Sequence, residues 1–98
     1  MFTTRPEILG TYGVVSSTHW LASSVAMKML EAGGNAFDAA VAAGMTLQVC
    51  EPHLNGPGGD MPGLIYRADQ RKAQVVCGQG VAPAGATIAH YKGLGLDM

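Results

Sequence analysis

Apolar and polar residues follow a helical period between residues 20 and 32. Apolar side chains recur three or four positions apart, which places them on one side of a helix. The stripe is made of Leu21, Val25, Met29 and Ala32 and is widened by Ala22, Ala26 and Leu30. The polar residues Ser23, Ser24, Lys28 and Glu31 fall on the remaining faces. This pattern predicts an amphipathic helix with one face toward solvent.

The next apolar stretch, residues 36–49, has almost no polar side. Its only polar side chains are Asp38, Thr46 and Gln48. We expect a helix that begins after the cap residue Asn35, with Asp38 completing a capping box. Gly33-Gly34 supplies the positive φ that ends the preceding helix, and Glu51-Pro52 ends this one because a residue before proline is pushed out of the α region.

A helix without a polar face has to be packed against neighbours on every side. A chain of 98 residues has a poor ratio of volume to surface and can enclose few elements completely. The apolar residues are also mostly small, because hydrophobic content is 48% but aromatic content only 6%. We therefore expect much of the covering surface to lie outside this chain. The alternative is a compact one-domain protein.

The remaining elements are short. Gly13–Ser17 is apolar and β-branched in the middle, which predicts a strand buried on both faces. Gly63–Tyr66 and Gln74–Cys77 predict an antiparallel hairpin across a polar connection, and Thr87 is expected to cap a last helix that runs to Leu94. Residues 1–10 are expected to form an extended arm. The order strand, helix, helix, strand, strand, helix predicts a mixed α/β (α+β) fold.

Charge and composition exclude several classes of partner. The net charge is −1 and the six Lys and Arg residues are scattered, so neither a nucleic acid nor an anionic membrane is expected as a partner. The first residues carry no apolar run typical of a secretory signal, so we expect a cytoplasmic location. The stretch Ala36–Cys50 falls short of the roughly 20 residues that span a bilayer.

Titratable and sulfur-containing residues give no clear catalytic or metal site. Neighbouring residues of an extended segment project to opposite faces, so adjacency within Ser17-Thr18-His19 does not by itself place a hydroxyl against the imidazole, and no catalytic pair is expected there. His19 is instead expected to help start the first helix. His53 is expected to be a hydrogen-bonded structural residue, and Asp60 to accept loop amides. Cys50 and Cys77 are expected to be buried thiols, and three methionines to fill the core: Met27, Met29 and Met45.

The loop Pro52–Asp60 is rich in glycine, but the spacing of its glycines matches neither the Walker lysine motif nor the dinucleotide fingerprint. It is therefore not expected to hold a phosphate. Its glycines permit close backbone approaches of the kind that line many sites.

Several spaced motifs together resemble the N-terminal part of the γ-glutamyltranspeptidase family. The resemblance extends over roughly residues 10–95, and residues 33–60 are its most specific part. In order along the chain the motifs are Gly13-Val14-Val15-Ser16-Ser17, Gly33-Gly34-Asn35-Ala36 with Asp38 and the alanines that follow, Glu51-Pro52-His53, Gly56 with Gly58-Gly59-Asp60, and Ala82-Pro83.

The resemblance implies an N-terminal-nucleophile hydrolase of four layers, α-β-β-α, made as a proenzyme that cleaves itself. In this family the new N-terminal threonine of the downstream subunit is nucleophile and, through its α-amine, base. No residue of this chain matches that threonine, so no catalytic residue is assigned here. Residues 1–98 are expected to be the N-terminal portion of the large subunit and inactive alone. No cofactor or metal is implied.

One departure from the family pattern concerns the substrate. Where the family usually has an arginine followed by Glu-x-Ala-Pro, which grips the α-carboxylate of the donor, this chain has Gln79-Gly80-Val81-Ala82-Pro83. Gln79 is therefore the candidate substrate-binding residue. Losing a charge-assisted bond worth on the order of 1.5–3 kcal/mol weakens glutamyl recognition by roughly ten- to a hundredfold.

The function that follows is cleavage of a small amide or γ-glutamyl donor, as in amidohydrolases that act on small acids such as oxamate. The expected partners are that small-molecule substrate and the rest of the proenzyme, including its small subunit. Two alternatives remain, a genuine glutathione-degrading transpeptidase and a non-catalytic structural or binding remnant.

Overall fold

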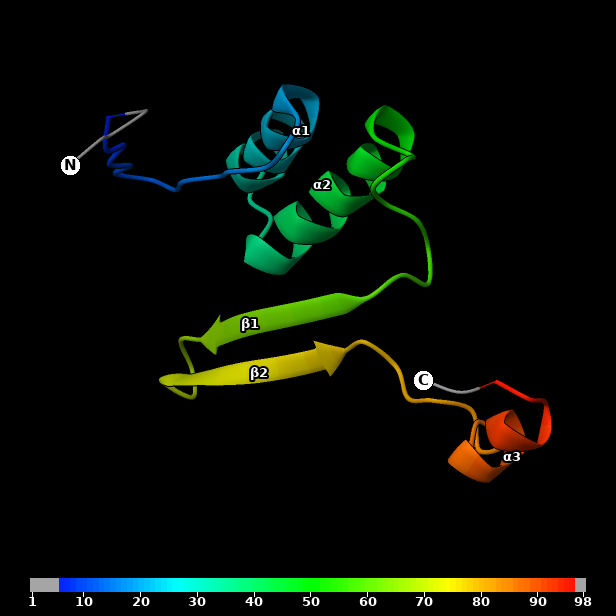
Figure 1. Ribbon diagram of the computed structural model, residues 1–98. Coiled ribbons are helices and arrows are strands. Elements are labelled where there is room, and N and C mark those ends of the chain that lie inside the picture. Colours follow the sequence, from blue (N-terminus) through cyan, green and yellow to red (C-terminus); the bar gives the residue numbers. More distant parts are fainter. Residues whose placement is uncertain (1–5, 97–98) are drawn as a thin grey trace. The chain divides into compact units, whose positions relative to one another are not determined.

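The computed structural model describes residues 6–96, so the predicted arm is seen only from Pro6 onward (Figure 1). The chain divides into two compact units, which meet between Pro57 and Gly58. The first unit contains helices α1 (Trp20–Glu31) and α2 (Ala36–Cys50). The second contains strands β1 (Met61–Arg67) and β2 (Lys72–Gly78) and helix α3 (Ile88–Gly93). Both long helices and the hairpin agree with the sequence pattern.

Helices α1 and α2 pack against each other through alanines. Ala22 and Ala26 of α1 and Ala39 of α2 are the buried apolar residues of the described chain. The prediction placed Leu21 and Met29 on the central line of the buried face of α1, but both remain partly exposed. The buried face is centred one residue further along, on Ala22 and Ala26. The separation of two packed helices depends on the side chains between them, and alanines permit a close approach that leaves larger side chains at the flanks.

The connection between the helices is determined by local hydrogen bonds. At Gly33 φ is +91°, and the Gly33 and Gly34 amides donate to the carbonyls of Leu30 and Met29 at 2.9 Å each. This pair of bonds is the Schellman arrangement at a helix C-terminus. It confirms that the glycine pair ends α1.

Asn35 begins α2 as predicted. Its Oδ1 accepts from the amides of Phe37 at 2.8 Å and Asp38 at 3.2 Å, and Asp38 Oδ2 accepts from the Asn35 amide at 2.9 Å. The capping box is therefore complete. The Asp38 carboxylate also lies where the helix dipole favours negative charge.

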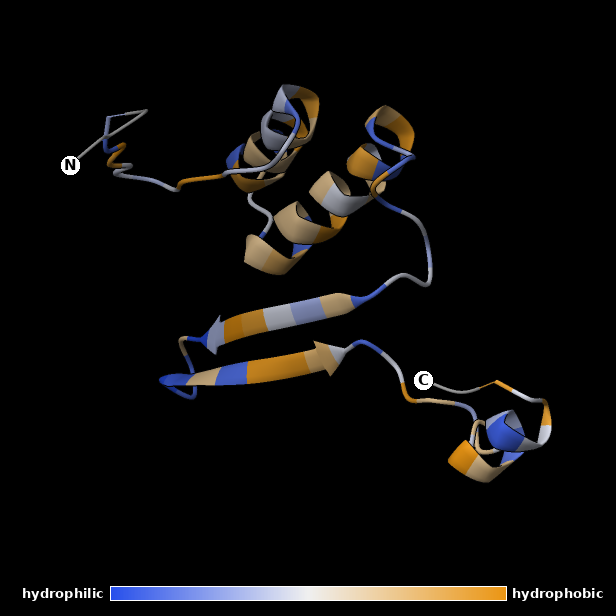
Figure 2. Cartoon of the chain, in the orientation of Figure 1, coloured by the Kyte–Doolittle hydropathy of each residue, from blue (hydrophilic) through white to orange (hydrophobic). Residues whose placement is uncertain are grey.

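Within the first unit, residues 6–57, α2 is covered on one side only. Four apolar side chains spaced four residues apart are exposed on it: Phe37, Val41, Met45 and Val49, with exposed fractions of 49%, 62%, 61% and 81%. Apolar positions along α2 are drawn in orange in Figure 2. Met45 is thus not core filler in this chain, because α1 contacts only the alanine side of α2. The first unit, of which residues 6–57 are described, does not itself supply the surface expected to cover α2 on its other sides.

Gly13–Ser17 is extended but pairs with no strand among residues 6–96, so the predicted buried strand is wrong for this chain. The segment instead lies along α1. The Tyr12 hydroxyl donates to the Leu30 carbonyl at 2.6 Å, and the Ser17 and Ser23 hydroxyls are 2.6 Å apart. Its backbone conformation was predictable from its β-branched residues, whereas ladder formation requires a second strand.

The second unit contains the predicted hairpin. β1 and β2 are antiparallel, with register from Met61 opposite Gly78 to Arg67 opposite Lys72. Helix α3 begins as predicted, because Thr87 Oγ1 accepts from the His90 amide at 3.2 Å. Its C-terminus is followed by Gly95, where φ is +74°.

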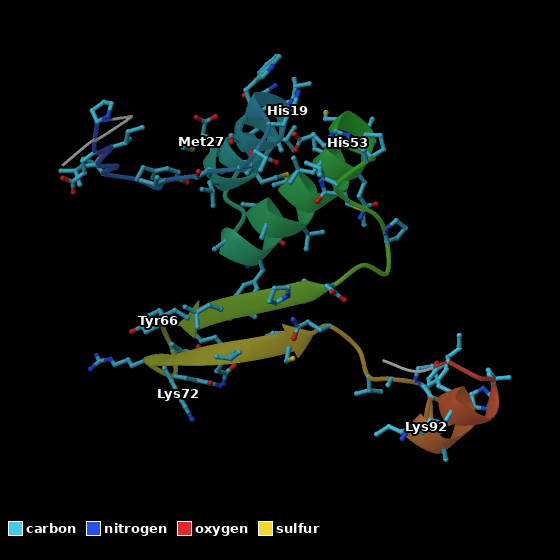
Figure 3. The ribbon with its side chains drawn as sticks, in the orientation of Figure 1. His19, Met27, His53, Tyr66, Lys72 and Lys92 are labelled. Atoms are coloured by element: carbon cyan, nitrogen blue, oxygen red, sulfur yellow. The ribbon has the colours of Figure 1, made fainter. Side chains whose placement is uncertain are left out.

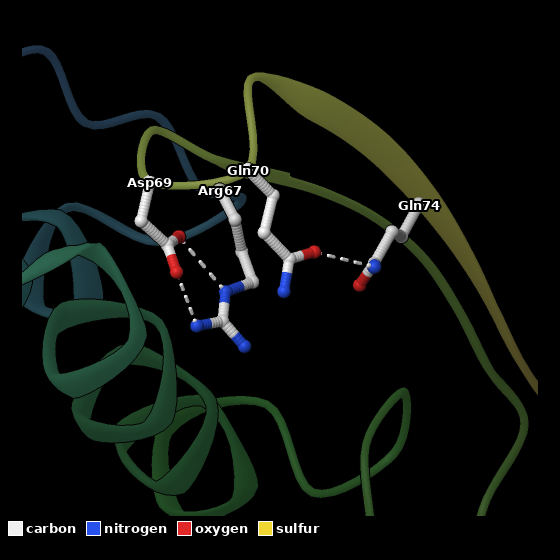
Figure 4. Close-up of polar contacts among 4 residues, drawn as sticks. All are labelled: Arg67, Asp69, Gln70 and Gln74. Atoms are coloured by element: carbon white, nitrogen blue, oxygen red, sulfur yellow. Dashed lines mark hydrogen bonds and ion pairs between the residues drawn. The ribbon is translucent and has the colours of Figure 1, made fainter.

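An ion pair stabilises the hairpin turn (Figure 4). Arg67 donates from Nη2 to Asp69 Oδ2 at 2.7 Å and from Nε to Oδ1 at 3.1 Å. The hydrogen bonds from Arg67 lower the pKa of Asp69 below its ordinary value of 3.8. Arg67 also lies opposite Lys72, and like charges in directly opposed positions of a ladder are unfavourable. Asp69 therefore offsets a repulsion built into the register.

The cap of α2 gives a first testable expectation. Replacement Asn35→Ala removes the acceptor of two amides at the helix N-terminus and should lower the free energy of unfolding by about 1 kcal/mol. Asn35→Asp keeps an acceptor at the same position and serves as the matched control. Urea unfolding followed by far-UV circular dichroism measures both. Equal losses in the two variants would contradict the capping role.

The turn gives a second expectation, which concerns titration. Because the folded-state pKa of Asp69 is depressed, the ion pair stabilises the hairpin above the unfolded-state value of 3.8 and this contribution is lost as pH falls through the folded-state pKa. In Arg67→Gln the pKa of the Asp69 carboxyl should rise toward its ordinary value. NMR titration of the carboxyl carbon measures it. Lys72→Gln removes a nearby cation that is not bonded to Asp69 and should produce a smaller rise; the reverse order would exclude the ion pair as the cause.

Candidate functional site

Gln79 follows the last residue of β2 and is exposed to solvent. The chain turns directly after it, because Gly80 has φ of +76°, a conformation that side chains with a Cβ rarely adopt. The candidate substrate residue is therefore held between a hydrogen-bonded strand on one side and a glycine turn on the other. This placement fixes the backbone of Gln79 while leaving its amide group open to a ligand.

The amide of Gln79 has one neighbour in the described chain. Cys77 lies two residues earlier on β2, and its Sγ–H donates to Gln79 Oε1 across 3.2 Å. Nε2 of Gln79 has no hydrogen-bond partner among residues 6–96. Since Nε2 carries two N–H donors, the group that Gln79 offers is a neutral donor pair. Such a pair can bind a carboxylate or carbonyl oxygen, but without the positive charge of a guanidinium.

The Cys77 contact was missed in the sequence, although the spacing contained the necessary information. Residues two apart on a strand project to the same face, so Cys77 and Gln79 were candidates for contact. Cys77 is exposed, which corrects the expectation of a buried thiol, whereas Cys50 is partly buried. The cause is the register of the hairpin. Cys77 shares its face with Val75 and Leu64, which are 80% and 77% exposed.

The glycine-rich loop begins with a turn anchored on α2. The amides of Leu54 and Asn55 donate to the carbonyl of Glu51 at 3.0 and 3.2 Å. Beyond the turn, Gly58 adopts φ of +97°. His53, labelled in Figure 3, and Asp60 are both exposed. Neither side chain forms a hydrogen bond within residues 6–96. The hydrogen bonds expected for these two residues are therefore not formed in this chain.

The residues before α1 make hydrogen bonds that have a structural role. Ser17 Oγ donates to the His19 carbonyl at 2.7 Å, while His19 Nδ1 accepts from the Leu21 amide at 3.2 Å. His19 therefore caps α1, and its imidazole is not bonded to Ser17. Both expectations for this pair are confirmed.

A second contact joins the start of α1 to the end of α2. The Thr18 hydroxyl donates to Glu51 Oε2, and Glu51 is the C-cap residue of α2. The two residues are 33 positions apart, so no local pattern in the sequence could have indicated this contact. It fixes the open ends of the helical pair to each other.

Within residues 6–96 no group of three or more His, Cys, Asp or Glu side chains is placed to bind a metal ion. In the same residues, none of the helices combines the length and hydropathy needed to cross a bilayer.

The fold is similar to that of a solved enzyme. A γ-glutamyltranspeptidase from Pseudomonas nitroreducens, solved in complex with L-DON, superposes with a TM-score of 0.73 and is 32% identical in sequence. The match covers 85% of this chain and 24% of the solved chain. The predicted fold class is therefore confirmed: this mixture of helices and strands is part of an N-terminal-nucleophile hydrolase fold.

Two curated relatives extend the similarity to sequence. The glutathione hydrolase-like YwrD proenzyme of Bacillus subtilis (strain 168) is 41% identical over 87 residues, which are 89% of this chain and 17% of the relative. The oxamate amidohydrolase proenzyme of Klebsiella pneumoniae is 36% identical over 85 residues, which are 87% of this chain and 16% of the relative. The chain thus spans about a sixth of the length of the relatives that it matches.

The family model described as gamma-glutamyltranspeptidase matches residues 22–97, which include most of α1, the capping box of α2, the glycine-rich loop and Gln79. Family model, curated relatives and solved structure agree, and this chain belongs to the gamma-glutamyltranspeptidase family.

Proposed function

We propose that this chain forms the donor-binding start of an amidohydrolase or acyltransferase that cleaves a small amide or γ-glutamyl donor. Gln79 contributes hydrogen-bond donors to the acidic group of that donor, and the 56–60 loop contributes to the shape of the pocket. The observation that carries the proposal is the free Nε2 of Gln79 at the position where the family motif usually has arginine.

The chemistry of the amide supports a donor other than an ordinary γ-glutamyl group. A guanidinium binds a carboxylate through two charge-assisted hydrogen bonds, whereas a neutral amide donates weaker bonds to the same oxygens. A donor whose binding depends less on an α-carboxylate loses less affinity when glutamine replaces arginine at this position. The similarity to an oxamate amidohydrolase proenzyme supports a small amide as the substrate class.

The catalytic step of this proposal belongs to residues outside the chain. In the mechanism implied by the family, a threonine at the N-terminus of the downstream subunit attacks the amide carbon, its α-amine takes the proton, and water or an amine then releases the acyl group. Residues 1–98 are inactive without that threonine. The proposed partners are the donor and the rest of the proenzyme, and the proposed location is the cytoplasm.

A second candidate is hydrolysis of glutathione itself, which is favoured by the similarity to the glutathione hydrolase-like proenzyme of Bacillus subtilis. In that case another residue replaces the missing arginine and binds the α-carboxylate. In the first candidate Gln79 limits turnover of the glutamyl donor, whereas in the second it does not. Substitution of Gln79 therefore separates the two candidates.

The decisive experiment compares donors in the full-length protein that contains this segment. Wild-type protein should turn over oxamate or a similar small amide and should be a poor catalyst with γ-glutamyl-p-nitroanilide. Gln79→Arg should raise kcat/KM for the glutamyl donor by about ten- to a hundredfold, because it restores a charge-assisted bond worth about 1.5–3 kcal/mol.

Gln70→Arg is the matched control, since Gln70 lies in the turn at the opposite end of the hairpin and gains the same charge. It should leave kcat/KM unchanged. Efficient turnover of the glutamyl donor by the wild-type protein would defeat the inference from Gln79 and favour the glutathione-degrading candidate. A full-length protein without turnover of any amide would favour the non-catalytic alternative.

A further inference from the structure

Glu51 joins three parts of the first unit. Its amide donates to the Leu47 carbonyl at 2.7 Å and closes the last turn of α2. Its carboxylate accepts a hydrogen bond from the hydroxyl of Thr18, which lies just before α1. The beginning of α1 and the end of α2 lie at the same end of the helical pair, as Figure 1 shows. Glu51 is therefore attached both to its own helix and to the start of the neighbouring one.

The carbonyl of Glu51 anchors the start of the glycine-rich loop. It accepts from the amides of Leu54 and Asn55 and, across 3.3 Å, from Nδ2 of Asn55. Asn55 is thus bonded to this oxygen through its backbone and its side chain. A carbonyl oxygen has two lone pairs, so three donors use its full capacity as an acceptor. Because Gly56 follows directly, the place where the loop leaves α2 depends on the direction of the Glu51 carbonyl.

The direction of that carbonyl is not determined by α2 alone. Glu51 is the C-cap residue, and its φ of −133° and ψ of 57° lie outside the helical region. The last carbonyls of a helix have no acceptor role within the helix, so a C-cap residue can turn about the helix end. The charge-assisted bond from Thr18 gives Glu51 a second point of attachment. A residue attached at two points turns only if one of the two bonds breaks.

We propose that Thr18 is a positioning residue for the donor pocket, acting through Glu51 on the start of the glycine-rich loop. The link from Thr18 to Asn55, the residue before Gly56, consists of two successive hydrogen bonds that meet at Glu51. The effect on donor binding rests on the proposed function, in which the 56–60 loop contributes to the shape of the pocket. The positioning of the turn rests only on contacts within the first unit.

Amide hydrogen exchange in the full-length protein tests the positioning. Thr18→Val removes the hydroxyl but keeps a β-branched side chain at an exposed position. The amides of Leu54 and Asn55 should then exchange about five- to thirtyfold faster, the factor that corresponds to losing one to two kcal/mol. Thr18→Ser keeps the hydroxyl and should exchange like the wild type. Unchanged exchange in Thr18→Val, or fast exchange of both amides in the wild-type protein, would overturn the proposal.

Thr46→Val is the matched control. Thr46 Oγ1 donates to the Ala42 carbonyl at 2.8 Å within α2, so this variant also loses the hydrogen bond of a threonine hydroxyl, but not one to Glu51. It should leave the exchange of the two turn amides unchanged. In a Glu51→Ala background, Thr18→Val should have no further effect, because the bond it removes is already absent. Additive effects of the two substitutions would exclude an action through Glu51.

Donor kinetics separate this proposal from the proposed function. In the full-length protein, Thr18→Val should raise KM for oxamate about fivefold and change kcat by less than about twofold, because a displaced pocket wall weakens donor binding. Faster exchange with an unchanged KM would overturn the role of Thr18 in donor binding. Faster exchange in a protein that turns over no amide would contradict the proposed function while supporting the positioning of the turn by Thr18.

Discussion

The contact that the first unit depends on is the alanine-lined interface between α1 and α2. Ala22, Ala26 and Ala39 are the residues that it buries, and each removes little apolar area from water. Their value lies in geometry, because small side chains let the two helices approach closely. The close approach leaves the larger apolar residues at the flanks and on the far side of α2, where Val41 and Val49 remain exposed. The helical pair is therefore shaped for burial by additional polypeptide.

The second unit also presents an exposed apolar face. An isolated two-stranded hairpin is at best marginally stable in water. On β1 and β2 the face with Leu64 and Val75 is apolar and exposed, while the turn is stabilised by the exposed ion pair of Arg67 and Asp69. Membership of a family whose relatives are about six times longer accounts for such surfaces. The units described here present apolar faces because they are layers of a larger fold.

Features determined within a few residues were predictable from the sequence. Asn35, Thr87 and Gly33 form the caps and the helix end that their types indicate, since each acts on amides or carbonyls within one helical turn. Features that depend on a distant neighbour were not. The centre of the α1 stripe moved by one residue and Gly13–Ser17 found no ladder, because helix packing and strand pairing are decided by what lies opposite.

In the candidate site, too, local features could be predicted from the sequence and contacts between distant residues could not. Gln79 was selected as a candidate because its position in a family motif is a property of sequence, and its role stays a prediction. The bond between Thr18 and Glu51 joins residues 33 positions apart and leaves no local trace in the sequence. Cys77 is an intermediate case, since alternation along a strand places it beside Gln79 but does not show that their side chains bond.

Under the proposed function, the bond from Cys77 to Gln79 has a consequence for donor specificity. With Oε1 of Gln79 accepting from the thiol, the amide presents its N–H groups and acts toward a ligand as a donor. A neutral donor discriminates weakly between a carboxylate and a carbonyl, because the Coulomb advantage that a guanidinium gives to an anion is absent. Specificity is a difference between affinities, so replacing the cation lowers the affinity for an α-carboxylate while leaving that for a neutral amide nearly unchanged. Under the proposed function, a single uncharged side chain at the end of β2 would broaden the range of donors that the same fold can accept.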